Sequence, residues 1–312
     1  MPKIECRFIP DILIGLALSF ALSIAGLANQ DLHEYFGTQA KGMAGSFRAV
    51  ANSNDALHYN PAGLSTLRRF NIDTEYLFDL APTAGHRMGA NVVDSVTTAL
   101  GAGVDYHLTA LSGTDGKEVF SHNGRLAAAV AVLPPWINLG LTLKYLHLPP
   151  LREEEKLFSG FSLDAGSLVN LPFGLSWGIV GYNLIPTHTE KAPVSLGMGA
   201  AWDAVRGLAG EGSHERVMPS APSWLTFAFD WLYRDLENPT KKDHQLSVGA
   251  EVVVAKVLPI RAGYAWSLNA PDNHLSVGMG YAAQTFACQI VYEHRFDLNK
   301  PATVGFVLRG YL

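Results

Sequence analysis

The last third of the chain alternates between apolar and polar residues, and this pattern constrains the fold more than any other feature. Leu246 and Val248, for example, alternate with Gln245 and Ser247. Successive side chains of a β-strand point to opposite faces, so a period of two indicates strands. The pattern runs through five consecutive segments, which predict five consecutive antiparallel strands: 244–254, 258–268, 275–282, 286–296 and 304–312.

Two architectures produce such alternation, a soluble β-sandwich and a transmembrane β-barrel. The apolar positions of the five segments contain no Asp, Glu, Lys or Arg. A lipid-facing wall requires this, because a midplane Arg or Lys costs about 2–4 kcal/mol. The polar faces are rich in Gly, Ser and Ala, as a crowded lumen needs. The apolar faces end in aromatic residues that suit an interfacial girdle, which favours the barrel: Tyr264, Trp266, Tyr292 and Phe296.

The alternation continues toward the N-terminus with more interruptions. Nine further strands are predicted near 69–81, 84–95, 98–109, 123–133, 137–148, 159–168, 173–185, 192–203 and 222–234. The total of about fourteen is even, as a closed bacterial barrel needs. The predicted fold class is therefore all-β, a closed antiparallel transmembrane β-barrel spanning 69–312, in the bacterial outer membrane and in contact with its lipids.

The connections between these strands predict an orientation. Short connections near 95–98, 134–136, 169–172, 255–257 and 284–285 are expected on the periplasmic side, and longer polar ones at 110–122, 149–158 and 235–243 outside. The long connection at 204–221 breaks this rule. The final strand ends in Tyr311 and Leu312, which resembles the terminal strand that the barrel-assembly machinery recognises.

Residues 1–28 have the features of a cleaved signal peptide. Lys3 and Arg7 precede an apolar run at 12–25, and the small residues Gly26 and Ala28 suit cleavage after position 28. The alternative is a membrane-anchor helix, but the run is short of the roughly 20 residues that such a helix needs. Cleavage would leave Cys288 as a lone cysteine. The net charge of −5 and the absence of a Lys/Arg block exclude a nucleic-acid partner.

Residues 29–68 do not alternate, and their sequence resembles a known family. A glycine-rich run with Gly42 and Gly45 leads to Asp55, which is followed by the motif Asn60, Pro61, Ala62 and Gly63. This order resembles the N-terminal segment of the FadL-like long-chain fatty-acid transporter superfamily, including its PorV-like relatives. The resemblance implies an N-terminal hatch at 29–68, folded into the barrel lumen along the transport path.

Elementary backbone chemistry agrees with a compact hatch. Pro61 fixes its own φ and biases Asn60 toward an extended conformation, while Gly63 relaxes the chain beyond it. An ordinary turn leading into the first strand is the alternative. The chain is short for a fatty-acid transporter, which favours the PorV-like branch, whose members serve protein secretion or surface attachment.

No pattern in the chain predicts catalysis, a cofactor or a metal. Gly174, Ser176 and Gly178 match a G-x-S-x-G motif, but that motif needs a strand-to-helix turn and here lies in a predicted strand. The eleven histidines are dispersed, without an H-E-x-x-H motif or paired cysteines. The sequence predicts a protein that is not an enzyme.

The charged residues of the alternating segments are expected to face the lumen. Those of the last strands are Glu251, Arg261, Glu293, Arg295 and Arg309, and the earlier ones are Asp73, Glu75, Asp79, Asp105, Lys144, Asp164, Asp203 and Asp230. One interpretation is an ion-pair network that anchors the hatch. The other is a polar pore lining that tunes selectivity.

Two functions remain open. The first is passive uptake of small hydrophobic molecules such as long-chain fatty acids around the hatch, with a sideways exit shaped by Asn60, Pro61 and Ala62. The second is a structural or docking barrel with a secreted or surface-attached protein partner. The first predicts an apolar pocket between hatch and wall, and the second a sealed barrel.

Overall fold

The computed structural model describes residues 37–80, 85–112, 118–150, 157–187, 192–204, 224–236, 243–269, 272–296 and 301–312. Three predictions fall on residues outside these ranges. They are the signal peptide at 1–28, the first part of the hatch at 29–36 and nearly all of the connection at 204–221.

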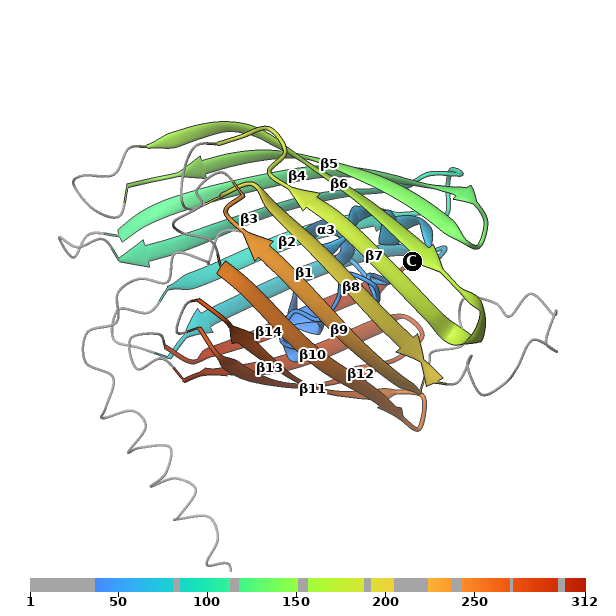
Figure 1. Ribbon diagram of the computed structural model, residues 1–312. Helices are drawn as coiled ribbons and strands as arrows, with labels where there is room; N and C mark the ends of the chain where they lie inside the picture. The colour runs from blue at the N-terminus through green and yellow to red at the C-terminus, as the bar shows by residue number, and fades with distance from the viewer. Residues whose placement is uncertain are drawn as a thin grey trace, which may run out of the picture.

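The described residues form a closed antiparallel barrel, which Figure 1 shows from the side. Every strand pairs with its neighbours in sequence, and β1 closes the barrel by pairing with β14. The strands are β1 (Phe70–Asp79), β2 (His86–Asp94), β3 (Gly101–Ser112), β4 (Glu118–Leu133), β5 (Ile137–Leu148), β6 (Phe158–Asn170), β7 (Leu175–Tyr182), β8 (Ser195–Asp203), β9 (Leu225–Arg234), β10 (Asp243–Val254), β11 (Leu258–Ser267), β12 (His274–Ala282), β13 (Phe286–Arg295) and β14 (Thr303–Tyr311). The predicted fold class, including the number of strands, is confirmed.

The two faces of the wall divide as the alternation predicts. On β5, Leu141 is 54 % exposed on the outside, whereas the neighbouring Thr142 is fully buried on the inside. Closure pairs the backbone groups of both edge strands, which a hydrocarbon environment requires. The apolar outer wall and the closed fold are those of an outer-membrane barrel, which confirms the predicted location.

Among the described residues, none forms a helix that is long and apolar enough to cross a membrane.

The two ends of the barrel differ in their connections. One end carries the connections at 95–100, 134–136, 171–174, 255–257 and 283–285 and the C-terminus. We call it the turn end and the opposite end the loop end. The short helix η3 (Pro172–Gly174) lies at the turn end.

Most strand boundaries differ from prediction by a few residues, and two of these differences have a clear physical reason. Residues 118–122 were expected in a loop, but β4 begins at Glu118, which pairs with Ser112. The polar Glu118 and His122, which stand at outward positions, hide this extension in the sequence. Strand β7 ends at Tyr182 instead of 185, because Asn183 adopts a left-handed φ of 54° and its backbone N–H donates to the Asp164 carboxylate at 2.9 Å.

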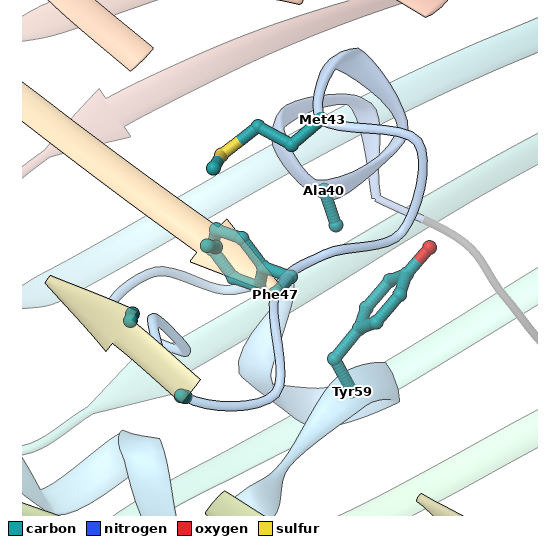
Figure 2. Packing of buried hydrophobic residues seen from close by; sticks show 7 residues of the cluster. Ala40, Met43, Phe47 and Tyr59 are labelled. Carbon is teal, nitrogen blue, oxygen red and sulfur yellow. The ribbon is translucent and has the colours of Figure 1, made fainter. Parts of the chain in front are cut away.

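Residues 37–69 lie inside the barrel, and we call them the lumen segment. It contains α2 (Thr38–Gly42), α3 (Ala56–Tyr59) and η2 (Pro61–Ser65), drawn in blue within the strands in Figure 1. Its own small core gathers Ala40, Met43, Phe47 and Tyr59, as Figure 2 shows. The Phe47 and Tyr59 rings meet edge to face, with centroids 5.9 Å apart.

Candidate functional site

The candidate site is the contact between the lumen segment and the inner wall. One part of it is the motif Asn60 to Gly63, in which Asn60 caps η2. The Asn60 backbone is extended, with φ −160°, and its side-chain oxygen accepts a hydrogen bond from the Ala62 N–H at 3.2 Å. Pro61 occupies the first helical position, where a missing N–H costs nothing.

The same motif fits against glycines of the wall. A Cβ added to Gly140 of β5 would lie 2.4 Å from the Ala62 nitrogen, and one added to Gly166 of β6 would lie 2.3 Å from the Asn60 side-chain oxygen. These glycines are needed for close approach, because any side chain would displace the motif. The Asn60 amide also donates to the Ser167 carbonyl oxygen at 3.0 Å, which binds the motif to the wall.

The wall beside the motif is continuous. Gly140 pairs with Gly166, and Leu168 pairs with Gly178 on β7. The structure therefore contains no opening next to Asn60, and a sideways exit there would require these strand pairs to separate.

Of the other predicted residues of the lumen segment, Gly42 and Asp55 face β11 to β14, whereas Gly45 lies beside Tyr59 of the segment itself. A Cβ on Gly42 would lie 3.3 Å from the Arg261 side chain, and Gly45 has a left-handed φ of 81° that favours glycine. Asp55 accepts a hydrogen bond from the Ala40 N–H at 2.8 Å and lies 3.6 Å from the Arg309 guanidinium. Burial raises the pKa of the Asp55 carboxyl, and the positive charge of Arg309 opposes this rise.

The five predicted lumen charges of the last strands are all ion-paired. Arg309 binds Asp73 at 2.6 Å, and Arg261 binds Glu251. Arg295 lies 2.9 Å from Glu293, which also faces Lys41 of the lumen segment at 3.7 Å. Of the earlier charges, Asp203 is half-buried at the end of β8, and the others are buried: Asp73, Glu75, Asp79, Asp105, Lys144, Asp164 and Asp230.

One strong contact was not predicted as a pair. Asp230 of β9 accepts hydrogen bonds from the backbone N–H groups of Phe47 and Arg48, and it binds the Arg48 guanidinium at 3.0 Å. Arg48 also donates to the Tyr182 hydroxyl at 2.9 Å. The alternation places Asp230 inward, but nothing in the sequence shows that its partner is Arg48.

A buried histidine cluster also escaped prediction. His58 of α3 lies 3.5 Å from Asp105 of β3, and His107 lies 3.0 Å from the same carboxylate. The possible ligand atoms of these three side chains lie within 4.8 Å of one another, close enough to hold a metal ion. However, Arg125 binds Asp105 at 3.0 Å and already supplies a positive charge there, so we interpret the group as an ion-pair cluster. Burial, aided by Arg125, lowers the pKa of His58 to about 4.

A cavity of about 50 Å³ lies between the lumen segment and the loop end of the wall. Its lining is mainly polar and includes Lys41, Arg48, Arg87, Arg234, Asp272 and Arg295. Burial lowers the pKa of Lys41, and the Glu293 carboxylate opposes this shift. The cavity is too small and too polar to be the apolar pocket that the uptake hypothesis predicted.

The G-x-S-x-G match has no catalytic geometry. Gly174 ends η3, and Ser176 lies in β7 with no helix following it. The Ser176 hydroxyl donates to the Ala49 carbonyl oxygen at 2.9 Å, so it holds the lumen segment.

Solved structures share the fold of this chain, although no family model and no curated protein matches its sequence. The toluene transporter TbuX of Ralstonia pickettii aligns over 89% of this chain and 99% of its own, with a TM-score of 0.61 and 10% identity. The toluene transporter TodX of Pseudomonas putida aligns over 89% and 98%, with a TM-score of 0.57 and 13% identity. The monoaromatic hydrocarbon channel CymD aligns over 88% and 95%, with a TM-score of 0.56 and 14% identity. This chain therefore shares the fold of these transporters and channels, which agrees with the resemblance to the FadL-like superfamily.

Proposed function

We propose that this chain is a plugged outer-membrane channel for passive uptake of small hydrophobic molecules, such as long-chain fatty acids. The observation that carries the proposal is a closed fourteen-strand barrel whose lumen segment fits the wall through the Asn60 to Gly63 motif. The likeness to hydrocarbon channels supports the transport class. No catalytic residue or cofactor is needed, since the ligand would move down its concentration gradient.

The filled lumen sets a condition on this function. The cavity of about 50 Å³ beside the lumen segment is too small for a fatty-acid chain, and we infer that the segment shifts when a molecule passes. The contacts of the Asn60 to Gly63 motif should oppose this movement, because they join the lumen segment to β5 and β6.

The same filled lumen favours a second candidate, a docking barrel for a secreted or surface-attached protein. Such a barrel needs no path and would use its loop end as the partner surface. Recognition of β14 by the barrel-assembly machinery is expected under both functions.

Uptake of labelled long-chain fatty acid and of labelled toluene tests the proposal. Cells lacking the protein would be complemented with wild type, with Pro61→Gly or with Pro172→Gly as the matched control. Both prolines begin a short 3-10 helix, but Pro172 lies at the turn end in η3, away from the motif. We expect uptake to require the protein and to change in Pro61→Gly alone. Equal uptake of both compounds in all strains would exclude the channel and favour the docking barrel.

A further inference from the structure

The described histidines on the outer wall all lie at the loop end. His86 and His244 stand at or next to the start of their strands, His122 lies in the first half of β4, and His147 and His294 lie near the ends of theirs. Each is at least partly exposed and follows the outward parity of its strand. The turn end carries exposed aromatic residues, among them Trp177 and Tyr281, but no histidine in the described ranges.

Four of these histidines share one arrangement, in which an aromatic side chain lies within hydrogen-bond distance of Nδ1. The exception is His147, whose Nδ1 faces the Ser159 hydroxyl. The Tyr76 hydroxyl lies 2.7 Å from Nδ1 of His86, and the Tyr106 hydroxyl lies 2.7 Å from Nδ1 of His122. The ring of Tyr233 stacks on His244, with centroids 4.6 Å apart. Trp and Tyr are the residues usually enriched at membrane interfaces, so an ordinary aromatic belt does not account for histidines at this position.

The partner of His244 fixes where its proton lies. Trp231 donates its indole N–H to Nδ1 of His244 at 3.3 Å, and an indole nitrogen can only donate. In the neutral ring the proton is therefore on Nε2, which is a donor. At His86 and His122, Nδ1 is likewise bonded to a tyrosine hydroxyl, and where that hydroxyl donates, the ring proton is on Nε2 there too.

An N–H donor on the outside of a barrel needs an acceptor, because leaving it in hydrocarbon is unfavourable. Lipid headgroups supply that acceptor at the membrane boundary. A phosphate satisfies the donor best, because a hydrogen bond to a charged acceptor is stronger than one to a neutral acceptor.

We propose that the loop end of the outer wall is a binding surface for phosphate-bearing lipid headgroups, contacted through His86, His122, His244 and His294. The surface surrounds much of the barrel, because the four histidines come from β2, β4, β10 and β13. The proposal rests on the membrane location of the barrel and is independent of what the lumen transports.

Binding of lipid A to the purified full chain in a neutral detergent tests this surface. Lipid A carrying its phosphates would be compared with dephosphorylated lipid A. We expect the phosphorylated form to bind about tenfold more tightly, as charge-assisted hydrogen bonds do relative to neutral ones. Equal affinity of the wild type for the two lipids would overturn the proposal, whatever the variants do.

Variants locate the effect on the wall. The combination of His86→Phe, His122→Phe, His244→Phe and His294→Phe keeps the wall apolar and should abolish the preference for phosphate. The control combination of Trp177→Phe and Tyr281→Phe at the turn end should retain it. Loss in the control, or retention in the histidine variant, would contradict the assignment. Inorganic phosphate at the concentration of the lipid should not compete, and competition would overturn a lipid as the occupant.

Discussion

The lumen segment is held on its two sides by different forces. On the β5 to β7 side, Asn60 and Pro61 touch glycine backbones, so the contact depends on shape and on hydrogen bonds between uncharged groups. On the β11 to β14 side and at β1, Asp55 and Lys41 face Arg309 and Glu293. The first side should be sensitive to a single added methyl group, and the second to charge. The close fit to the glycines therefore sets the position of the lumen segment, and the ion pairs hold it with a strength that depends on charge.

The largest effect is expected on the charged side. Arg309→Met leaves the carboxylates of Asp73 and Asp55 without their shared cation and should lower the free energy of unfolding by about 3–5 kcal/mol. Urea unfolding of the purified barrel measures this change. Lys256→Met, at an exposed position in a turn, is the matched loss of one positive charge and should cost little. An equal cost in the two variants would show that the Arg309 contacts do not stabilise the fold.

The next effect breaks the shape-dependent side. Gly140→Ala places a Cβ 2.4 Å from the Ala62 backbone and should cost about 1–3 kcal/mol through overpacking. The chain before β1 should then become more accessible to limited proteolysis. Gly124→Ala on the adjacent β4 is the control, since its nearest neighbour would be 4.0 Å away. Unchanged stability and proteolysis in Gly140→Ala would contradict the close fit.

A pH series sharpens the contrast through His58, whose pKa is lowered to about 4 by burial. Below its ordinary pKa of 6.5 the unfolded chain binds a proton that the folded chain does not, so this group makes stability fall as pH drops from 6.5 toward 4. At pH 5 the loss should be on the order of 2 kcal/mol. The stability difference between wild type and His58→Gln, measured against pH, isolates this group from Asp55, whose raised pKa acts in the opposite direction. A difference that is constant between about pH 7 and pH 5 would show that His58 titrates normally.

The smallest effect concerns Asn60 itself. Asn60→Ala removes the donors to the Arg48 and Ser167 carbonyl oxygens and should cost about 1–2 kcal/mol. Unlike the effect of His58, this loss should not vary with pH. Asn60→Asp distinguishes shape from charge, because it keeps the size of the side chain and places an unpaired carboxylate in the wall contact.

The sequence predicted the wall far better than the site. Alternation identifies which residues of a strand face outward, because lipid and lumen impose opposite chemistry on neighbours such as Leu141 and Thr142. It fails where both neighbours are polar, as at the start of β4. The contacts of the lumen segment could not be predicted from the sequence for another reason. The partners of Asn60 are glycines on distant strands, and a glycine gives no sequence signal of what approaches it. Likewise, Arg48 meets Asp230 and His58 meets Asp105 only because the closed barrel surrounds the lumen segment.

The central claim is that molecules pass only when the lumen segment moves. The side chains of Ser65 and Asn138 lie in contact, with their oxygens 2.9 Å apart, so Ser65→Cys with Asn138→Cys can cross-link η2 to β5. The background would carry Cys6→Ser and Cys288→Ser to remove both native thiols, and each single cysteine variant serves as a control. Uptake of labelled fatty acid would be measured before and after oxidation. The account predicts that uptake falls on oxidation in the double variant alone and returns on reduction. Full uptake through a barrel whose cross-link is verified by mass spectrometry would contradict it.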